Sequence, residues 1–151
     1  MEVQVASLCD AAADYNGKLS LLGAFDTVLV QQFPAVHPHC SVALRIVFRD
    51  EDAGNHVLRL AMIDEDGKNL LPKIEAQLNI QLADNMFFSS NNLVFNLQGL
   101  QFPAAGQYSI DISMDNNMIA RIPLQVLKVD AAQQPPGQAP PPPPPPPEPE
   151  F

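Results

Sequence analysis

The sequence has no tryptophan, only two cysteines and no long apolar run. A membrane-spanning helix needs about 20 consecutive apolar residues, so no segment of this sequence is expected to cross a bilayer. The first ten residues lack the basic and apolar regions of an export signal, and we therefore expect a cytoplasmic protein. In a reducing compartment Cys9 and Cys40 are expected to remain free thiols.

Positive charge is also sparse. Eight lysines and arginines stand against 17 aspartates and glutamates, which gives a formal net charge of -9. The basic residues are scattered along the chain and form no cluster. Nucleic acids and anionic membrane surfaces both require a local positive patch. We therefore expect neither nucleic acid nor a membrane among the partners.

Recognisable catalytic motifs are missing as well. The chain has no Gly-x-Ser-x-Gly, no phosphate-cradling glycine loop and no His-Glu-x-x-His, and its seven glycines are spread through turns. The sequence predicts a protein that is not an enzyme. On this basis we assign no catalytic, cofactor-binding or metal-binding residue, and we expect no cofactor.

Helical periodicity is absent, and apolar residues instead alternate with polar ones in three segments. The weak helical pattern at 9–15 amounts to one turn. Alternation predicts strands with one dry and one wet side. The residues predicted to face a core are Val42, Leu44, Ile46 and Phe48, then Ile74, Ala76, Leu78, Ile80 and Leu82, and finally Tyr108, Ile110, Ile112 and Met114. The predicted wet side of the first strand holds Ser41, Ala43, Arg45, Val47 and Arg49. Weaker strand candidates cover residues 2–9, 18–22, 24–30, 56–63, 93–97 and 119–129.

Turn residues separate these strands and favour an antiparallel β-sandwich. Glycine, asparagine and aspartate gather at 15–17, 51–55, 65–67 and 115–117, where they tolerate positive φ. Strand and turn recur about every ten residues. Tyr108 follows Gly106 as in the Gly-x-Tyr strand entry of immunoglobulin-like sandwiches, where the tyrosine hydroxyl ties a corner back onto the backbone. We therefore predict a structural role for Tyr108, although Ile110 replaces the cysteine of antibody domains. We expect an all-β, antiparallel, immunoglobulin-like sandwich in which Pro123 marks a sheet edge or a bulge.

Composition changes near residue 130. We predict a β-sandwich domain over 1–129 and a disordered, proline-rich segment over 130–151, with eight consecutive prolines at 140–147. Such a segment docks on aromatic-lined grooves of other proteins or serves as a spacer. No arginine or lysine flanks the prolines to orient them in a groove, so we favour the spacer.

The segment 37–40 carries the alternative hypothesis of a small metal-dependent or hydrolytic enzyme. His37, His39 and Cys40 bring two imidazoles and a thiol together, and Cys9 is a conceivable neighbour in space. Nitrogen and sulfur ligands suit zinc. The spacing matches no closed zinc site, however, and the proline between the histidines is typical of an extended loop. Whether the four side chains converge is left open by the sequence.

Two acidic turns, at 50–52 and 64–67, offer oxygen ligands of the kind calcium binds. The second begins like half of a calcium loop but lacks the closing glutamate. We interpret both as solvated turns. His56 is the remaining candidate for a catalytic base, and no motif surrounds it.

The favoured hypothesis is a non-enzymatic protein-interaction or structural module with a polyproline tether. Phe87 and Phe88, beside Met86, are two adjacent large residues that cannot both face one core from a strand. Another protein is therefore expected to bind through this region, through an edge strand or through the proline segment. Self-association through exposed strand edges, giving a homo-oligomer, is a further hypothesis.

Several short motifs resemble those of one protein family. They are Leu8-Cys9-Asp10-Ala11-Ala12, Lys18-Leu19 with Leu22-Gly23-Ala24-Phe25-Asp26, Phe33-Pro34 and His37-Pro38. The chain is similar, from residue 1 to about 129, to a family of small bacterial proteins that contain a domain of unknown function. The resemblance implies a compact cytoplasmic β domain without an assigned activity. It transfers no site residue, and we expect Asp10, Gly23, Phe25 and Asp26 to shape the first hairpin.

Overall fold

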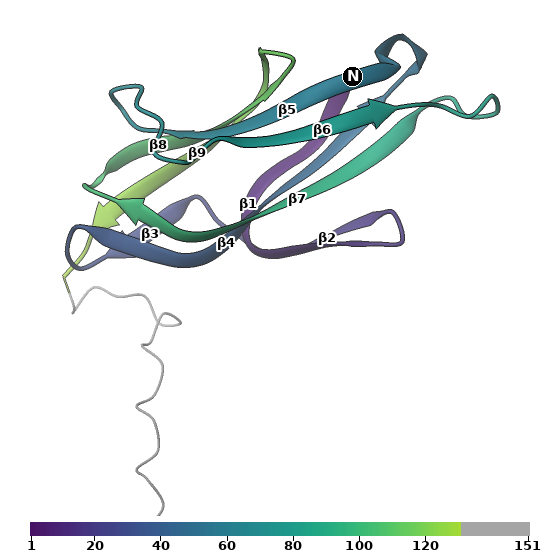
Figure 1. The fold of residues 1–151 in the computed structure, drawn as a ribbon. Helices are drawn as coiled ribbons and strands as arrows, with labels where there is room; N and C mark the ends of the chain where they lie inside the picture. Colours follow the sequence, from purple (N-terminus) through teal and green to yellow (C-terminus); the bar gives the residue numbers. More distant parts are fainter. Residues whose placement is uncertain (131–151) are drawn as a thin grey trace, which may run out of the picture.

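The computed structural model describes residues 1–130, which form two β-sheets packed face to face (Figure 1). The first sheet has the order β2-β1-β4-β7 and the second β3-β9-β8-β5-β6. In chain order the strands are β1 (Glu2–Tyr15), β2 (Lys18–Ala24), β3 (Thr27–Val30), β4 (Ala35–Phe48), β5 (Gly54–Ile63), β6 (Ile74–Ile80), β7 (Ser89–Phe102), β8 (Gly106–Met114) and β9 (Asn117–Lys128). Within these residues, the helical content is one 3₁₀ turn, η1 (Asp50–Asp52). The all-β prediction is confirmed.

The order of the strands is that of an immunoglobulin-like sandwich. In the lettering of those domains, β4 and β7 correspond to strands B and E, and β5, β8 and β9 to C, F and G, with β6 extending the second sheet. The pairings are antiparallel except for β3, which runs parallel to β9. The predicted fold class is confirmed, with this short parallel pair added where the N-terminal segment switches sheets.

The core lies between the two sheets and follows the predicted alternation. The inward-facing side chains of β4 and β8 are almost completely buried: Val42, Leu44, Ile46, Phe48, Tyr108, Ile110, Ile112 and Met114. In β6 only Ile80 is fully buried, because β6 stands at the end of its sheet and has a neighbour on one side. Leu82 lies beyond the end of β6 and is half-buried.

The second half of β1 pairs with the whole of β2, and together they form a hairpin that lies over the outer face of the first sheet. Residues 2–9 of β1 pair with β4, whereas residues 9–15 pair with β2. The hairpin then folds back over β4. There, Nη1 of Arg45, a β4 residue, donates to the Gly17 carbonyl in the hairpin turn at 3.1 Å. Asn92 Nδ2 of β7 donates to Asp14 Oδ2 at 3.2 Å. Figure 1 shows this hairpin running beneath β4 and β7 as a partial third layer.

The third layer corrects the prediction of a wet outer face on β4. Ser41, Ala43 and Val47 were predicted to face solvent, and all three are buried. The hairpin spans from the level of Ser41 to the level of Arg45, and it therefore shields Ser41 and Ala43 from water. Ser41 keeps a hydrogen bond while buried, since its Oγ lies 2.8 Å from Asn96 Oδ1.

Some predicted boundaries were wrong. Residues 9–15, the weak helical candidate, are extended in β1 because they pair along β2. The strand expected at 93–97 is part of the 14-residue β7. The one expected at 24–30 is shorter, since β3 begins only at Thr27. Phe87 and Phe88 lie in the loop before β7 rather than in a strand.

The prediction for Pro123 is confirmed. It lies in β9, whose outer edge is paired by β3 only from Gln125 onward. The Gln125 N–H points to that edge, where it donates to the Asp26 carbonyl at 2.8 Å. The nitrogen of Pro123, two residues earlier, therefore faces the same edge and has no proton to donate.

Candidate functional site

The loop between β6 and β7 presents the most exposed apolar cluster of adjacent residues in the described chain. Met86 is 47% exposed, Phe87 89% and Phe88 48%. We call residues 86–88 the apolar loop. It projects at one end of the sandwich, at the right of Figure 1. Adjacent large apolar side chains in water have no role in the core and typically mark a binding surface.

Exposed acidic side chains lie at the same end of the sandwich as the apolar loop. Phe48, the last residue of β4, pairs with Ser89, the first residue of β7. The residues that follow Phe48 therefore leave the sheet at the end where those that precede Ser89 enter it, which places η1 at the same end of the sandwich as the apolar loop. Asp50 and Glu51 of η1 and Asp84 within the β6–β7 connection are exposed. We call Asp50, Glu51 and Asp84 the acidic rim of this end of the sandwich.

Asp52, the third acidic residue of η1, is engaged internally. Its carboxylate lies 2.6 Å from the amino group of Met1 and accepts the backbone N–H of Arg49 at 2.9 Å. These hydrogen bonds lower the pKa of Asp52 below its usual range. The charge of Asp52 therefore holds η1 against the N-terminus and the end of β4.

The two cysteines lie on opposite faces of the first sheet. Cys9 on β1 pairs with Ser41 on β4, so these two side chains lie on the same, outer face. Cys40 directly precedes Ser41 along β4, and its side chain therefore points to the opposite face, into the core. Both are free and buried. Burial raises the pKa of the Cys9 thiol and raises that of Cys40 to about 11. Neither thiol is a ready nucleophile, because the thiolate is the reactive form.

The histidines of the 37–40 segment are likewise apart from the thiols. His39 is exposed, whereas His37 is half-buried with its ring 5.4 Å from that of Phe25. Burial lowers the pKa of His37. Among residues 1–130, no three histidine, cysteine or acidic side chains are arranged to hold a metal ion. Within the described residues, His37, His39, Cys40 and Cys9 are therefore not arranged as a metal site.

His37 instead lines a cavity of about 460 Å³ together with Asp10, Gly23 and Phe25. These residues come from β1, from the end of β2 and from β4. Gly23 has φ +68°, and a side chain at this position would collide with the Asp10 carboxylate. Residues from three of the motifs that carry the family resemblance thus gather at the base of the hairpin, a juxtaposition that linear spacing does not reveal.

The second acidic turn is closed by its own side chain. Asp64 Oδ1 accepts the backbone N–H groups of Asp66, at 2.9 Å, and of Lys68, at 2.8 Å. Gly67 takes the positive φ of +80° that this turn needs. The Asp64 carboxylate therefore serves the turn geometry.

His56 joins two loops. Its Nδ1 lies 2.6 Å from Asp115 Oδ2 and its Nε2 lies 2.7 Å from the Asp52 carbonyl oxygen. Both acceptors favour the protonated ring, and the pKa of His56 is raised by Asp115 first and by the Asp52 carbonyl second. Both ring nitrogens are occupied, which suits a structural cation rather than a general base.

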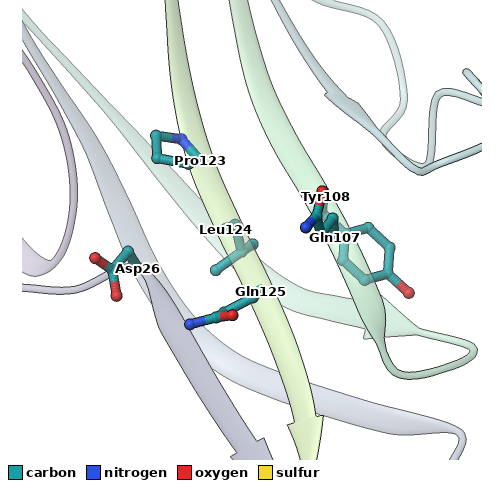
Figure 2. Close-up of a pocket in the computed structure, with 6 residues that line it drawn as sticks. All are labelled: Asp26, Gln107, Tyr108, Pro123, Leu124 and Gln125. Atoms are coloured by element: carbon teal, nitrogen blue, oxygen red, sulfur yellow. The ribbon is translucent and has the colours of Figure 1, made fainter.

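A shallow groove of about 330 Å³ lies along β9 near Tyr108 (Figure 2). Figure 2 shows Asp26 on one side of β9 and the Tyr108 ring on the other. The Tyr108 hydroxyl donates to the Ala104 carbonyl at 2.6 Å, and its ring packs edge-on against Phe102 at 5.2 Å. This is the corner that the Gly-x-Tyr pattern predicted, and the structural role of Tyr108 is confirmed.

Comparison with known proteins places the domain in a family. Residues 4–127 match a family described as a family of unknown function, DUF6941. The chain belongs to the DUF6941 family. This confirms the resemblance to a family of unknown function, and DUF6941 membership by itself assigns no activity. The match ends just before the last residues of β9, and most of the predicted proline-rich segment lies outside the residues that the structure describes.

Other comparisons add little to the DUF6941 assignment. No curated protein matches the chain. Among solved structures, a glycosyl hydrolase family 2 member from Bacteroides cellulosilyticus DSM 14838 is similar at 12% identity and a TM-score of 0.34. The match covers 62% of this chain and 14% of the hydrolase chain. Over residues 1–130, no helix has the length and apolar character needed to cross a membrane.

Proposed function

We propose that this domain is a non-enzymatic protein-interaction module that binds a protein partner through the apolar loop. The observation that carries the proposal is the 89% exposure of Phe87 between two partly exposed apolar neighbours. Aromatic side chains are the groups that most often supply the energy of protein interfaces. The partner offers an apolar pocket large enough for one aromatic ring.

The acidic rim defines the chemistry of that partner further. Asp50, Glu51 and Asp84 lie at the same end of the sandwich as the apolar loop, and the chain as a whole carries a net charge of -9. Complementary charge increases the rate of association and selects among partners. We infer that basic residues border the partner's pocket, so that added salt weakens the complex.

The framework of the apolar loop supports this function. The connection 81–88, which contains the apolar loop, leaves β6 where Ile80 pairs with Gly54 of β5. It enters β7 where Ser89 pairs with Phe48 of β4. Anchoring in both sheets restricts the loop before it binds. Preorganisation of this kind reduces the entropy lost on association.

The groups with chemical reactivity favour a binding role over catalysis. Cys40 and Cys9 are buried thiols with raised pKa values. His56 is held by Asp115 and by the Asp52 carbonyl. In this proposal the sandwich binds and the proline-rich segment, 130–151, tethers it. That segment lies outside the described residues except for its first, Asp130.

The test compares two variants of the full chain in affinity isolation from cells that express it. Phe87→Ser removes the central ring of the apolar loop, and Leu22→Ser removes an equally solvent-facing apolar side chain, 71% exposed, on the hairpin. We expect a protein that is retained by the wild type and by Leu22→Ser, released by salt, and lost with Phe87→Ser. An identical set of retained proteins for all three chains would refute the proposal.

A second pair of chains separates the loop from the tether. Deletion of 131–151 leaves the described domain intact, and we expect the same protein to be retained. If that deletion alone abolishes retention, the binding determinant lies in the proline-rich segment and the proposal is wrong.

A further inference from the structure

One edge of the first sheet is unpaired over a long strand. β7 stands at the end of its sheet and pairs with β4 alone, from Ser89 to Phe102. In the described part of the chain, no other backbone hydrogen bond reaches β7. A free edge of 14 residues presents a row of N–H and C=O groups ready to pair with another strand.

β7 carries none of the residues that protect edges in native proteins. Its sequence, SSNNLVFNLQGLQF, contains no charged residue and no proline. The other end strands are protected in different ways. β2 begins with Lys18, β6 has Glu75, and β3 is only four residues long. Where β2 and β3 leave their neighbours uncovered, β1 begins with Glu2 and β9 has Arg121 and Pro123. Charged residues, proline and very short strands at an edge oppose pairing with a second sheet, so β7 is the edge left open to it.

The inward side of β7 is incompletely covered as well. Leu93 and Phe95 pack against the core but remain half-buried, whereas Leu97 on the same side is buried. A strand added beside β7 would bring further side chains onto this side of the sheet. Burial of these two residues would then be completed across the new strand pair.

The geometry points to a second copy of this chain as the occupant: we propose a two-fold symmetric dimer in which β7 pairs antiparallel with β7. Gly99, at φ +62°, interrupts the strand. The regular part is therefore 89–98, and Val94 lies at the centre of residues 90–98 within it. A two-fold axis at Val94 sets Leu93 of one copy opposite Phe95 of the other, so the half-buried apolar residues of both copies meet.

An identical strand is the fitting partner for this edge because β7 offers no charge with which to select a different one. A two-fold axis also makes the surface self-complementary, as in most homodimers. The net charge of -9 on each copy opposes association, and salt screens that repulsion. Dimerisation should therefore strengthen with added salt, the opposite of the trend expected for the partner of the apolar loop.

The test is analytical ultracentrifugation of the full chain with a charge-swapped pair of variants. Around an axis at Val94, residue 90 of one copy faces residue 98 of the other, and Ser90 and Gln98 lie on the outer side with no side-chain hydrogen bond recorded in the structure. Wild type is expected to be dimeric. Ser90→Lys/Gln98→Lys places two like-charged pairs across the axis and is expected to weaken the dimer by roughly tenfold or more. Mixing it with Ser90→Glu/Gln98→Glu is expected to restore a dimer containing one copy of each.

The matched control places the same charge on β6, the strand at one end of the second sheet. Gln77→Lys/Asn79→Lys changes two exposed residues of β6 and is expected to leave the dimer unchanged. Phe87→Ser is also expected to remain dimeric, which separates this inference from the proposed function. A wild type that stays monomeric at every concentration and salt level, or a control that dissociates as readily as the β7 variant, would overturn the proposal.

Discussion

The hydroxyl of Tyr108 closes the connection between β7 and β8 with a single hydrogen bond. It donates to the Ala104 carbonyl four residues earlier, while the ring packs against Phe102. A short motif in the sequence was enough to predict this contact, because both partners are close in the chain. Contacts between residues that are close in the chain are the part of a structure that can be predicted best from the sequence.

Replacing Tyr108 by phenylalanine tests that hydrogen bond without removing the ring. We expect Tyr108→Phe to lower the free energy of unfolding by about 1 kcal/mol, the typical net contribution of one hydrogen bond. Urea denaturation measures it. Tyr15→Phe is the control, since Tyr15 is 68% exposed and its loss should change nothing. Equal stability of Tyr108→Phe and wild type would show that the corner is dispensable.

His56 gives the stability of the domain a dependence on pH. Its pKa is raised in the folded state by the Asp115 carboxylate and the Asp52 carbonyl. Its contribution is therefore fully present below the unfolded-state pKa of about 6.5 and is lost as the pH rises through the folded-state value. The stability difference between wild type and His56→Gln should be large in mild acid and shrink in mild alkali.

His37 provides the contrast. Burial lowers its pKa, so the folded state favours the neutral ring and stability falls as the pH drops through the unfolded-state value. The advantage of wild type over His37→Gln should decrease in mild acid, opposite to the trend for His56→Gln. Denaturation curves at a series of pH values measure both. Parallel trends for the two variants would contradict the assignment.

At the scale of elements, the hairpin of β1 and β2 is the feature that sequence patterns missed. Residues 9–15 have no apolar alternation strong enough to identify a strand, and their state depends on pairing with β2. The hairpin then covers Ser41 and Ala43, which alternation alone assigns to the wet side of β4. Whether a residue on the outer face of a strand is exposed depends on the layer packed against it, which alternation along the strand does not describe.

Arg45 holds that hairpin against the sheet. It donates to the Gly17 carbonyl, to Asn92 Oδ1 at 2.8 Å and to Gln4 Oε1 at 3.0 Å. Arg45→Met keeps the apolar part of the side chain and removes all three hydrogen bonds. We expect faster amide hydrogen exchange in residues 10–24 and unchanged exchange in β8.

The control for this prediction is Arg121→Met. Arg121 pairs with Asp111 on the second sheet, at 2.7 Å, and has no contact with the hairpin in the hydrogen-bond pattern. Its loss should leave residues 10–24 unaffected. Equal exchange in wild type and Arg45→Met would mean that packing alone holds the hairpin.

For the whole molecule, period-two alternation and turn spacing were sufficient to predict the sandwich. They identified the inward side of β4 and β8, which together supply much of the core. The apolar loop was recognised by composition but placed in a strand, because two phenylalanines beside a strand sequence resemble its continuation. Its exposure and its acidic rim depend on the register of β4 with β7, which only the assembled sheets define.

Site-specific photo-cross-linking in living cells tests the proposed binding surface most directly. A photoreactive residue is placed at position 87 in the apolar loop and, in a separate chain, at position 22 on the hairpin. We expect one dominant cross-linked protein from position 87, and we expect that protein to be absent from the products of position 22. No cross-link from position 87, or the same products from both positions, would contradict the account.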